Sequence, residues 1–96
     1  MAKIKVIKEA YIRYQLTTWQ GVAEVDGEEV TYRFAEDDNG SSLWTYTDEG
    51  GWSESDLVKE SHKILWAAFM EWGNPEEFGG AGEIAEIDDD CIEDYV

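Results

Sequence analysis

The sequence has few of the residues on which catalytic and metal sites in small proteins depend. It contains one cysteine, Cys91, so it cannot form an internal disulfide, and one histidine, His62, so no Cys/His pair has the spacing of a metal site. No motif places a nucleophile beside a base. We therefore expect no enzymatic activity, no cofactor and no bound metal, and we expect His62 and Cys91 to be packing or surface residues.

Long apolar runs are also missing. No segment approaches 18 consecutive apolar residues, and the lysines near the N-terminus alternate with apolar residues instead of preceding an apolar stretch. The sequence thus predicts neither a membrane span nor an export signal. Together with a single cysteine, this indicates a reducing, cytoplasmic location.

Basic residues are scarce and unevenly placed. The chain has 7 Lys and Arg against 23 Asp and Glu, which gives a formal net charge of −16. Charge of this size exceeds what solubility requires and lowers stability through self-repulsion, so it points to a function. Residues 1–13 hold four bases, Lys3, Lys5, Lys8 and Arg13, and one acid. Residues 71–96 hold 10 acids and no base. The acidic residues are therefore most concentrated in the C-terminal quarter.

The length and composition predict one domain over residues 1–96. Its 43% hydrophobic and 14% aromatic residues can supply one core, whereas two cores would each be too small. We expect three segments: a β-meander over 1–47, a helix over 53–73 and an acidic C-terminal segment over 76–96.

The first segment shows strand and turn signals. Polar and apolar residues alternate from Lys3 to Val6, which predicts a strand that continues toward Tyr14. Asp26-Gly27 lies between two β-rich runs and predicts a tight type I′ hairpin turn. A further strand is expected over 43–47. The side chains expected to face the core from the hairpin are Trp19, Ala23, Val25, Val30, Tyr32 and Phe34.

The middle segment has the pattern of one long amphipathic helix. Ser53 is a good N-cap and Asp56 stands in the capping-box position, while Gly73 and Pro75 supply a stop signal, so we expect a helix from Glu54 to Trp72. The predicted fold is α+β: an antiparallel β-meander of three to four strands packed against one long helix, with a short acidic C-terminal helix or tail.

The C-terminal segment allows two interpretations. Ile84, Ile87, Cys91 and Tyr95 recur at three- and four-residue intervals, which favours a short amphipathic helix with an acidic outer face. A strand over Glu83–Ile87 is the alternative.

Calcium binding is the first function to consider for the acidic clusters. An EF-hand loop that began at Asp37 would have Ser42 in place of the required glycine and Asp48 in place of the bidentate glutamate. The match is poor, so we interpret the clusters as solvated carboxylates.

The density of carboxylates suggests a different mechanism. Acids four residues apart on a helix lie about 5–6 Å apart, which is comparable to the spacing of phosphates along a nucleic-acid strand. A folded array of this kind can occupy a cleft lined by Lys and Arg. The candidate partner-binding residues are Asp37, Asp38, Asp48, Glu49, Glu54, Asp56, Glu76, Glu77, Glu83, Glu86, Asp88, Asp89, Asp90, Glu93 and Asp94. Trp44, Trp52 and Trp72 border these groups and are candidate aromatic anchors.

In size, charge, meander-then-helix order and lack of catalytic motifs, the chain resembles the small acidic phage-encoded inhibitors of bacterial defence, the anti-CRISPR and anti-restriction DNA mimics. The resemblance implies a partner such as a CRISPR or restriction nuclease complex, whose basic DNA-binding site would be blocked in the host cytoplasm. It implies no direct binding to nucleic acid or membrane.

The alternative is an acidic adaptor module that binds a basic protein without imitating DNA. The lysines of the first strand depart from a pure mimic. They either lie on an inner strand with their amines toward solvent or neutralise nearby acids.

Overall fold

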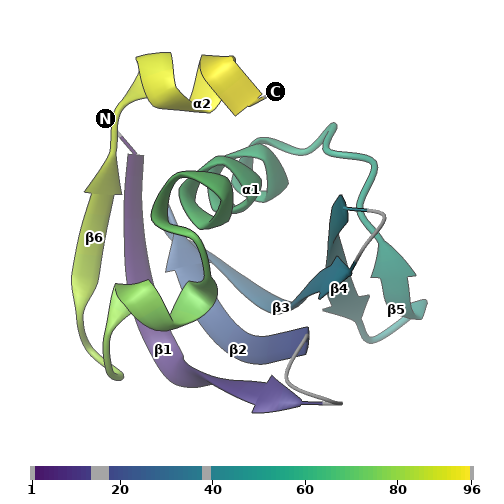
Figure 1. Ribbon diagram of the computed structural model, residues 1–96. Coiled ribbons are helices and arrows are strands. Elements are labelled where there is room, and N and C mark those ends of the chain that lie inside the picture. The colour runs from purple at the N-terminus through teal and green to yellow at the C-terminus, as the bar shows by residue number, and fades with distance from the viewer. Residues whose placement is uncertain (1, 14–17, 38–39, 96) are drawn as a thin grey trace.

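The computed structural model describes residues 2–13, 18–37 and 40–95, and it shows a curved antiparallel sheet wrapped around one helix (Figure 1). The six strands are β1 (Ala2–Arg13), β2 (Thr18–Val25), β3 (Glu28–Asp37), β4 (Gly40–Thr47), β5 (Gly51–Glu54) and β6 (Ile84–Ile87). Their order across the sheet is β5-β4-β3-β2-β1-β6. The helices are α1 (Glu60–Trp72), α2 (Asp89–Tyr95) and the short 3₁₀ helix η1 (Pro75–Phe78).

The predicted architecture of three to four strands against one long helix is wrong. The sheet has six strands, because β5 extends it beyond β4 and β6 extends it beyond β1. Residues 51–54 pair with β4, although Ser53 and Glu54 were expected at the start of the long helix, and Ser53 stands opposite Thr45. The hydrogen-bonded pairing of the β4–β5 hairpin overrides the capping signal at this position.

The helix α1 is accordingly short and begins at Glu60. Its N-cap position is Lys59, whose side chain makes no capping hydrogen bond, so the predicted Ser53/Asp56 capping box does not form. Asp56 instead accepts a hydrogen bond from the backbone N–H of Val58 at 3.2 Å, within the connection from β5 to α1.

The hairpin prediction is confirmed. Asp26 and Gly27 have φ angles of 49° and 90°, as a type I′ turn requires, and they join β2 to β3. Alternate side chains of both strands face α1 and are buried. Gly21 is necessary on this face, because a Cβ atom there would lie 2.7 Å from the hydroxyl oxygen of Tyr32.

Aromatic side chains from the sheet and α1 fill the core. Phe69 of α1 is fully buried, with its ring centroid 5.0 Å from those of both Tyr32 and Phe34, and Phe78 of η1 closes the cluster at 5.2 Å. Burial raises the pKa of Tyr32 well above its ordinary value. This cluster fixes the position of α1 inside the curve of the sheet.

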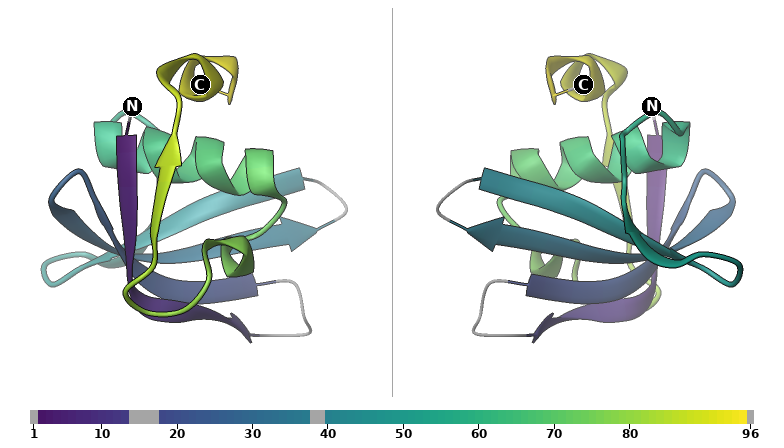
Figure 2. Two further views of the ribbon diagram at one scale, coloured as in Figure 1. Left: turned by 90° about the vertical axis from the view of Figure 1, so that its left-hand side faces the viewer. Right: turned by 90° about the vertical axis from the view of Figure 1, so that its right-hand side faces the viewer.

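The C-terminal segment combines parts of both predicted alternatives. Residues Ile84–Ile87 form the edge strand β6, and a helix begins only at Asp89. As the two side views show, α2 crosses over α1 on the side away from the sheet (Figure 2). The acidic helix therefore lies on an outer face of the molecule.

Candidate acidic binding surface

The helix α2 places carboxylates toward solvent because its apolar side chains face α1. Ile92 is buried in the core, whereas Asp90, Glu93 and Asp94 are exposed. Asp89 and Asp90 lie in the first helical turn, where negative charge interacts favourably with the helix dipole. The same carboxylates therefore stabilise α2 and face outward.

Glu71 of α1 joins this group through two contacts with α2. Its Oε2 atom accepts a hydrogen bond from the Tyr95 hydroxyl at 3.0 Å and lies 3.6 Å from Sγ of Cys91. The hydrogen bond to Glu71 raises the pKa of Tyr95, and burial raises the pKa of Cys91, with the charge of Glu71 adding to it. The Cys91 thiol is therefore held in its protonated form.

Glu60, at the start of α1, lies beside α2 as well. It lines a hollow of about 300 Å³ together with Asp89, Ile92 and Glu93. Three carboxylates from two helices thus surround one buried apolar side chain. We call the whole group the α2 acidic surface, and it consists of Glu60, Glu71, Asp88, Asp89, Asp90, Glu93 and Asp94.

The other predicted acids of the C-terminal segment are exposed but lie outside α2. Glu76 and Glu77 belong to η1, and Glu86 belongs to the edge strand β6, with Glu83 just before it. Glu83 and Glu86 therefore lie at the β6 edge of the sheet, whereas Glu76 and Glu77 lie on η1, which packs against β1 and α1.

The second predicted acidic set is not joined to the first. Asp48, Glu49, Glu54 and Asp56 are exposed, and they lie in or next to the β4–β5 hairpin, whereas β6 forms the opposite edge of the sheet. Asp38 and the side chain of Asp37 lie outside the described residues. The acids of the β4–β5 hairpin and those of β6 therefore lie at opposite edges of the sheet.

The three predicted tryptophan anchors differ in exposure. Trp44 is 36% exposed on the sheet face that points away from α1, which we call the open face. Trp52 is partly covered by Arg33, whose guanidinium carbon lies 4.0 Å from the centroid of the indole ring. Trp72 packs edge-on against Phe78 with a centroid distance of 5.0 Å. Of the three, Trp44 is best placed to contact a partner.

Sequence analysis missed further aromatic side chains on the open face. Tyr11 and Tyr46 are 52% and 44% exposed, and Tyr46 packs against Trp52 with a centroid distance of 5.5 Å. The alternation of Trp44 and Tyr46 with the buried Leu43 was a usable signal, since alternate residues of a strand lie on opposite faces.

The lysines of β1 also point to the open face. Lys3 and Lys5 stand opposite Glu86 and Glu24 on the neighbouring strands, so unlike charges face each other across the strand pairs. β1 lies between β2 and β6, inside the sheet. Both explanations offered for the basic strand therefore hold, because it is an inner strand whose lysines lie opposite acids.

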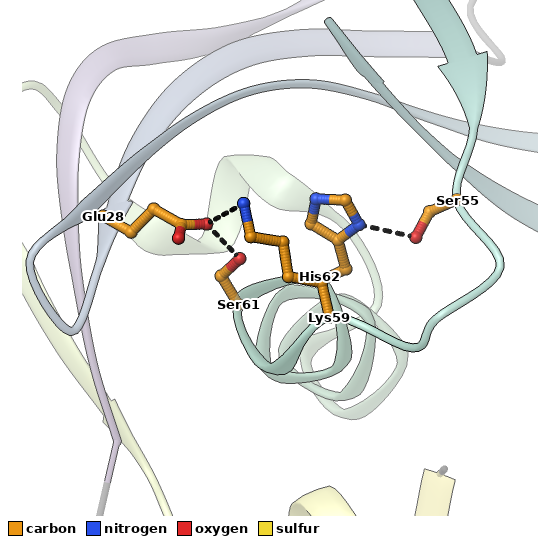
Figure 3. Close-up of polar contacts among 5 residues, drawn as sticks. All are labelled: Glu28, Ser55, Lys59, Ser61 and His62. Atoms are coloured by element: carbon orange, nitrogen blue, oxygen red, sulfur yellow. Dashed lines mark hydrogen bonds and ion pairs between the residues drawn. The ribbon is translucent and has the colours of Figure 1, made fainter. Parts of the chain in front are cut away.

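His62 takes part in a polar cluster where β5 connects to α1 (Figure 3). Its Nδ1 atom lies 2.8 Å from Oγ of Ser55, and the same Oγ accepts the backbone N–H of Leu57 at 3.1 Å. Burial lowers the pKa of His62 and favours the neutral ring. Its Nδ1 accepts the Ser55 hydroxyl hydrogen in the Nε2–H tautomer and donates to Oγ in the Nδ1–H tautomer. These bonds hold the left-handed backbone of Leu57, at φ 59°.

Glu28 ties the adjacent hairpin to the same helix. Its Oε2 atom accepts a hydrogen bond from the buried Ser61 hydroxyl at 2.6 Å and forms an ion pair with Lys59 at 3.0 Å (Figure 3). Both contacts lower the pKa of Glu28, that with Ser61 more than that with Lys59. The cluster therefore fixes the N-terminal end of α1 to the sheet.

Two further properties bear on the class of site. Among residues 2–13, 18–37 and 40–95, no group of three or more His, Cys, Asp or Glu side chains is arranged to hold a metal ion. In the same part of the chain, the helices are too short and too polar to cross a membrane.

Comparisons with known proteins leave the family open. No family model, curated protein or solved structure matches the chain. The functional argument therefore starts from the geometry and charge of this molecule.

Proposed function

We propose that the protein is a non-catalytic inhibitor that occupies the basic nucleic-acid-binding site of another protein with its α2 acidic surface. The observation that supports this most is the convergence of seven carboxylates from α1, α2 and Asp88 on one outer side of the molecule. Because α2 is packed on α1 through Ile92, these groups are held in place before binding and lose little conformational freedom on contact.

The spacing within α2 suits this role. Asp89 and Glu93, and likewise Asp90 and Asp94, are four residues apart on one helix, so their Cβ atoms lie about 5–6 Å apart. A cleft that binds a polyphosphate backbone presents cations at similar intervals. Unlike DNA, the carboxylate array is carried by a compact domain that can also exclude water around it.

The resemblance to small acidic phage-encoded inhibitors suggests the target class. The proposed partner is a CRISPR or restriction nuclease complex in the cytoplasm of the host cell, and the proposed outcome is that DNA can no longer enter its binding site. The electrostatic field of a protein with net charge −16 would speed the encounter with such a site.

An acidic adaptor that binds a basic protein without displacing nucleic acid is the second candidate. It is favoured by the β4–β5 hairpin, where the exposed acids Asp48, Glu49 and Glu54 lie near Tyr46 and Trp52. Aromatic anchors beside charges are typical of protein–protein interfaces and are not needed for phosphate mimicry.

Competition for DNA separates the two candidates. Purified RNA-guided and restriction nucleases are each bound to fluorescent duplex DNA that carries their site, and the protein is titrated in. The proposal predicts that DNA is released from at least one nuclease at a one-to-one ratio. A stable ternary complex would identify an adaptor, and direct binding of the protein to the free duplex would contradict both.

A further inference from the structure

The open face of the sheet carries an aromatic patch that no described element covers. Tyr11, Tyr46 and Trp44 are 52%, 44% and 36% exposed, while α1, α2 and η1 all lie on the other side of the sheet (Figure 2). Several large aromatic side chains on one face of a small protein usually mark an interaction site. This patch plays no part in the proposed action of the α2 acidic surface.

The pairing register arranges the patch in two rows across the middle strands. One row follows β1 to β4 and consists of Tyr11, Gln20, Arg33 and Trp44. The adjacent row consists of Lys8, Val22, Thr31 and, at the next position of β4, Tyr46. In the first row Trp44 of β4 stands directly opposite Arg33 of β3, and the β1 end carries Tyr11. In the second row Tyr46 stands at the β4 end and Lys8 at the β1 end.

Hydrogen bonding and stacking hold the centre of the patch. Nε of Arg33 donates to Oε1 of Gln20 at 2.9 Å while the guanidinium lies over Trp52. A hollow of about 280 Å³ lies on the Trp44 side of this pair, and another of about 450 Å³ lies on the Tyr11 side. The face therefore has relief into which aromatic side chains of a facing surface can fit.

Charge on the open face differs from that on the rest of the molecule. Its described outward side chains include four bases, Lys3, Lys5, Lys8 and Arg33, and four acids, Glu24, Glu29, Glu54 and Glu86. The whole chain has a net charge of −16, so two copies repel each other wherever their acidic surfaces meet. The balanced open face is where two copies can approach with least repulsion.

We propose that the open face is a homodimer interface, with the two-fold axis parallel to the strands and between β2 and β3. This axis places β4 of one copy over β1 of the other. Trp44 then faces Tyr11 of the second copy, and Tyr46 faces Lys8 of the second copy, which gives an aromatic pair and a cation–π contact on each side. Each side of the interface thus meets a chemically matching side of the second copy.

Dimerisation through this face leaves α2 free. The open face and α2 lie on opposite sides of α1, so a dimer presents two α2 acidic surfaces that point away from each other (Figures 1 and 2). The dimer proposal does not depend on the proposed function, since it concerns only the association of two copies of this protein.

Sedimentation equilibrium of the purified protein tests the dimer over a range of protein and NaCl concentrations. Salt screens the repulsion between the two acidic chains, so the dimer fraction should rise between about 0.05 M and about 1 M NaCl. Trp44→Glu should raise the dimer dissociation constant by about tenfold or more. Val58→Glu, which puts the same charge on a 70% exposed apolar residue outside the face, should leave it unchanged.

Tyr46→Ser provides a second variant, which should weaken the dimer without adding charge, and thermal unfolding checks that both variants fold. A monomer at all protein concentrations up to about 1 mM in about 1 M NaCl would overturn the proposal. So would equal effects of Trp44→Glu and Val58→Glu. Quenching of tryptophan fluorescence by oligothymidylate in the wild type but not in Trp44→Glu would assign the face to single-stranded nucleic acid instead.

Discussion

Glu71 is the residue that links the two helices of the α2 acidic surface. Its carboxylate accepts the Tyr95 hydroxyl proton at 3.0 Å and lies beside the Cys91 thiol, so α1 and α2 share one charged group. This carboxylate adds to the acidic surface. Cys91 also contacts it, and the reactivity of the Cys91 thiol reports on that contact.

The pKa of Cys91 is raised, first by burial and then by the charge of Glu71. A smaller fraction of the thiol is therefore ionised near pH 8, and alkylation by iodoacetamide should be slower than for a free cysteine. Glu71→Gln should shift the pH profile of the alkylation rate to lower pH. Glu93→Gln, an exposed change on α2 itself, is the control and should not shift the profile. Identical profiles for both variants would contradict the placement of Glu71.

At the scale of elements, the connection from β5 to α1 depends on His62 and Ser55. The bonds among Ser55, Leu57 and His62 keep the chain in a left-handed turn, so that a strand at one edge of the sheet can lead into a central helix. Because α1 begins without a side-chain N-cap, its start is positioned by these contacts in the preceding connection.

This arrangement predicts a specific pH dependence of stability. The pKa of His62 is below its ordinary value of 6.5 in the folded protein, so the stability it contributes is present above pH 6.5 and is lost as the pH falls. His62→Asn keeps an acceptor near Ser55 but does not titrate. The free energy of unfolding of the wild type, relative to His62→Asn, should be lower at about pH 5.5 than at about pH 7.5.

The expected change is small, roughly 0.5 kcal/mol or less, because His62 is only partly buried and solvent screens its charge. Urea unfolding of both proteins at the two pH values measures it. The pH dependence from the carboxylates is common to the wild type and His62→Asn, so it cancels when the two proteins are compared. The free energy of unfolding of the wild type minus that of His62→Asn should fall on acidification. If this difference stays constant or rises, His62 is not held neutral by the fold.

The elements also show how far the sequence determines the fold. Asp26-Gly27 and the alternation of the first strand were sufficient to predict β1 and the β2–β3 hairpin, because turn chemistry and strand periodicity are local. The strand β6 was only one of two alternatives for its segment, and β5 was not predicted at all. Ser53 carries a local helix-capping signal, and only its pairing with Thr45 of β4 places it in a strand.

The candidate site was predictable to a similar degree. Exposure of the acids Asp88–Asp90, Glu93 and Asp94 follows from their charge, but their proximity to Glu60 and Glu71 depends on the crossing of α2 over α1. The separation of the β4–β5 acids from this group depends on strand order. Neither of these follows from sequence spacing.

For the whole molecule, charge is divided between two sides. The α2 acidic surface lies outside α1, while Lys3, Lys5, Lys8 and Arg33 share the open face with four acids. The two proposed interactions therefore respond to salt in opposite directions. Added NaCl should weaken binding of the acidic surface to a basic partner and should strengthen association of two acidic chains through the open face.

The most direct test of the central claim compares two variants of equal charge in the DNA competition assay. One carries Asp90→Asn, Glu93→Gln and Asp94→Asn on α2, and the other carries Asp48→Asn, Glu49→Gln and Glu54→Gln at the β4–β5 hairpin. Each exposed charge pair contributes up to about 1 kcal/mol, so the α2 variant should displace DNA about 10- to 100-fold less well and with weaker salt dependence.

The hairpin variant should compete like the wild type apart from a small loss of long-range attraction. Unfolding by urea confirms that both variants are folded, so that a loss of competition can be assigned to the surface. Equal competition by the α2 variant and the wild type, or a loss confined to the hairpin variant, would contradict the assignment of binding to the α2 acidic surface.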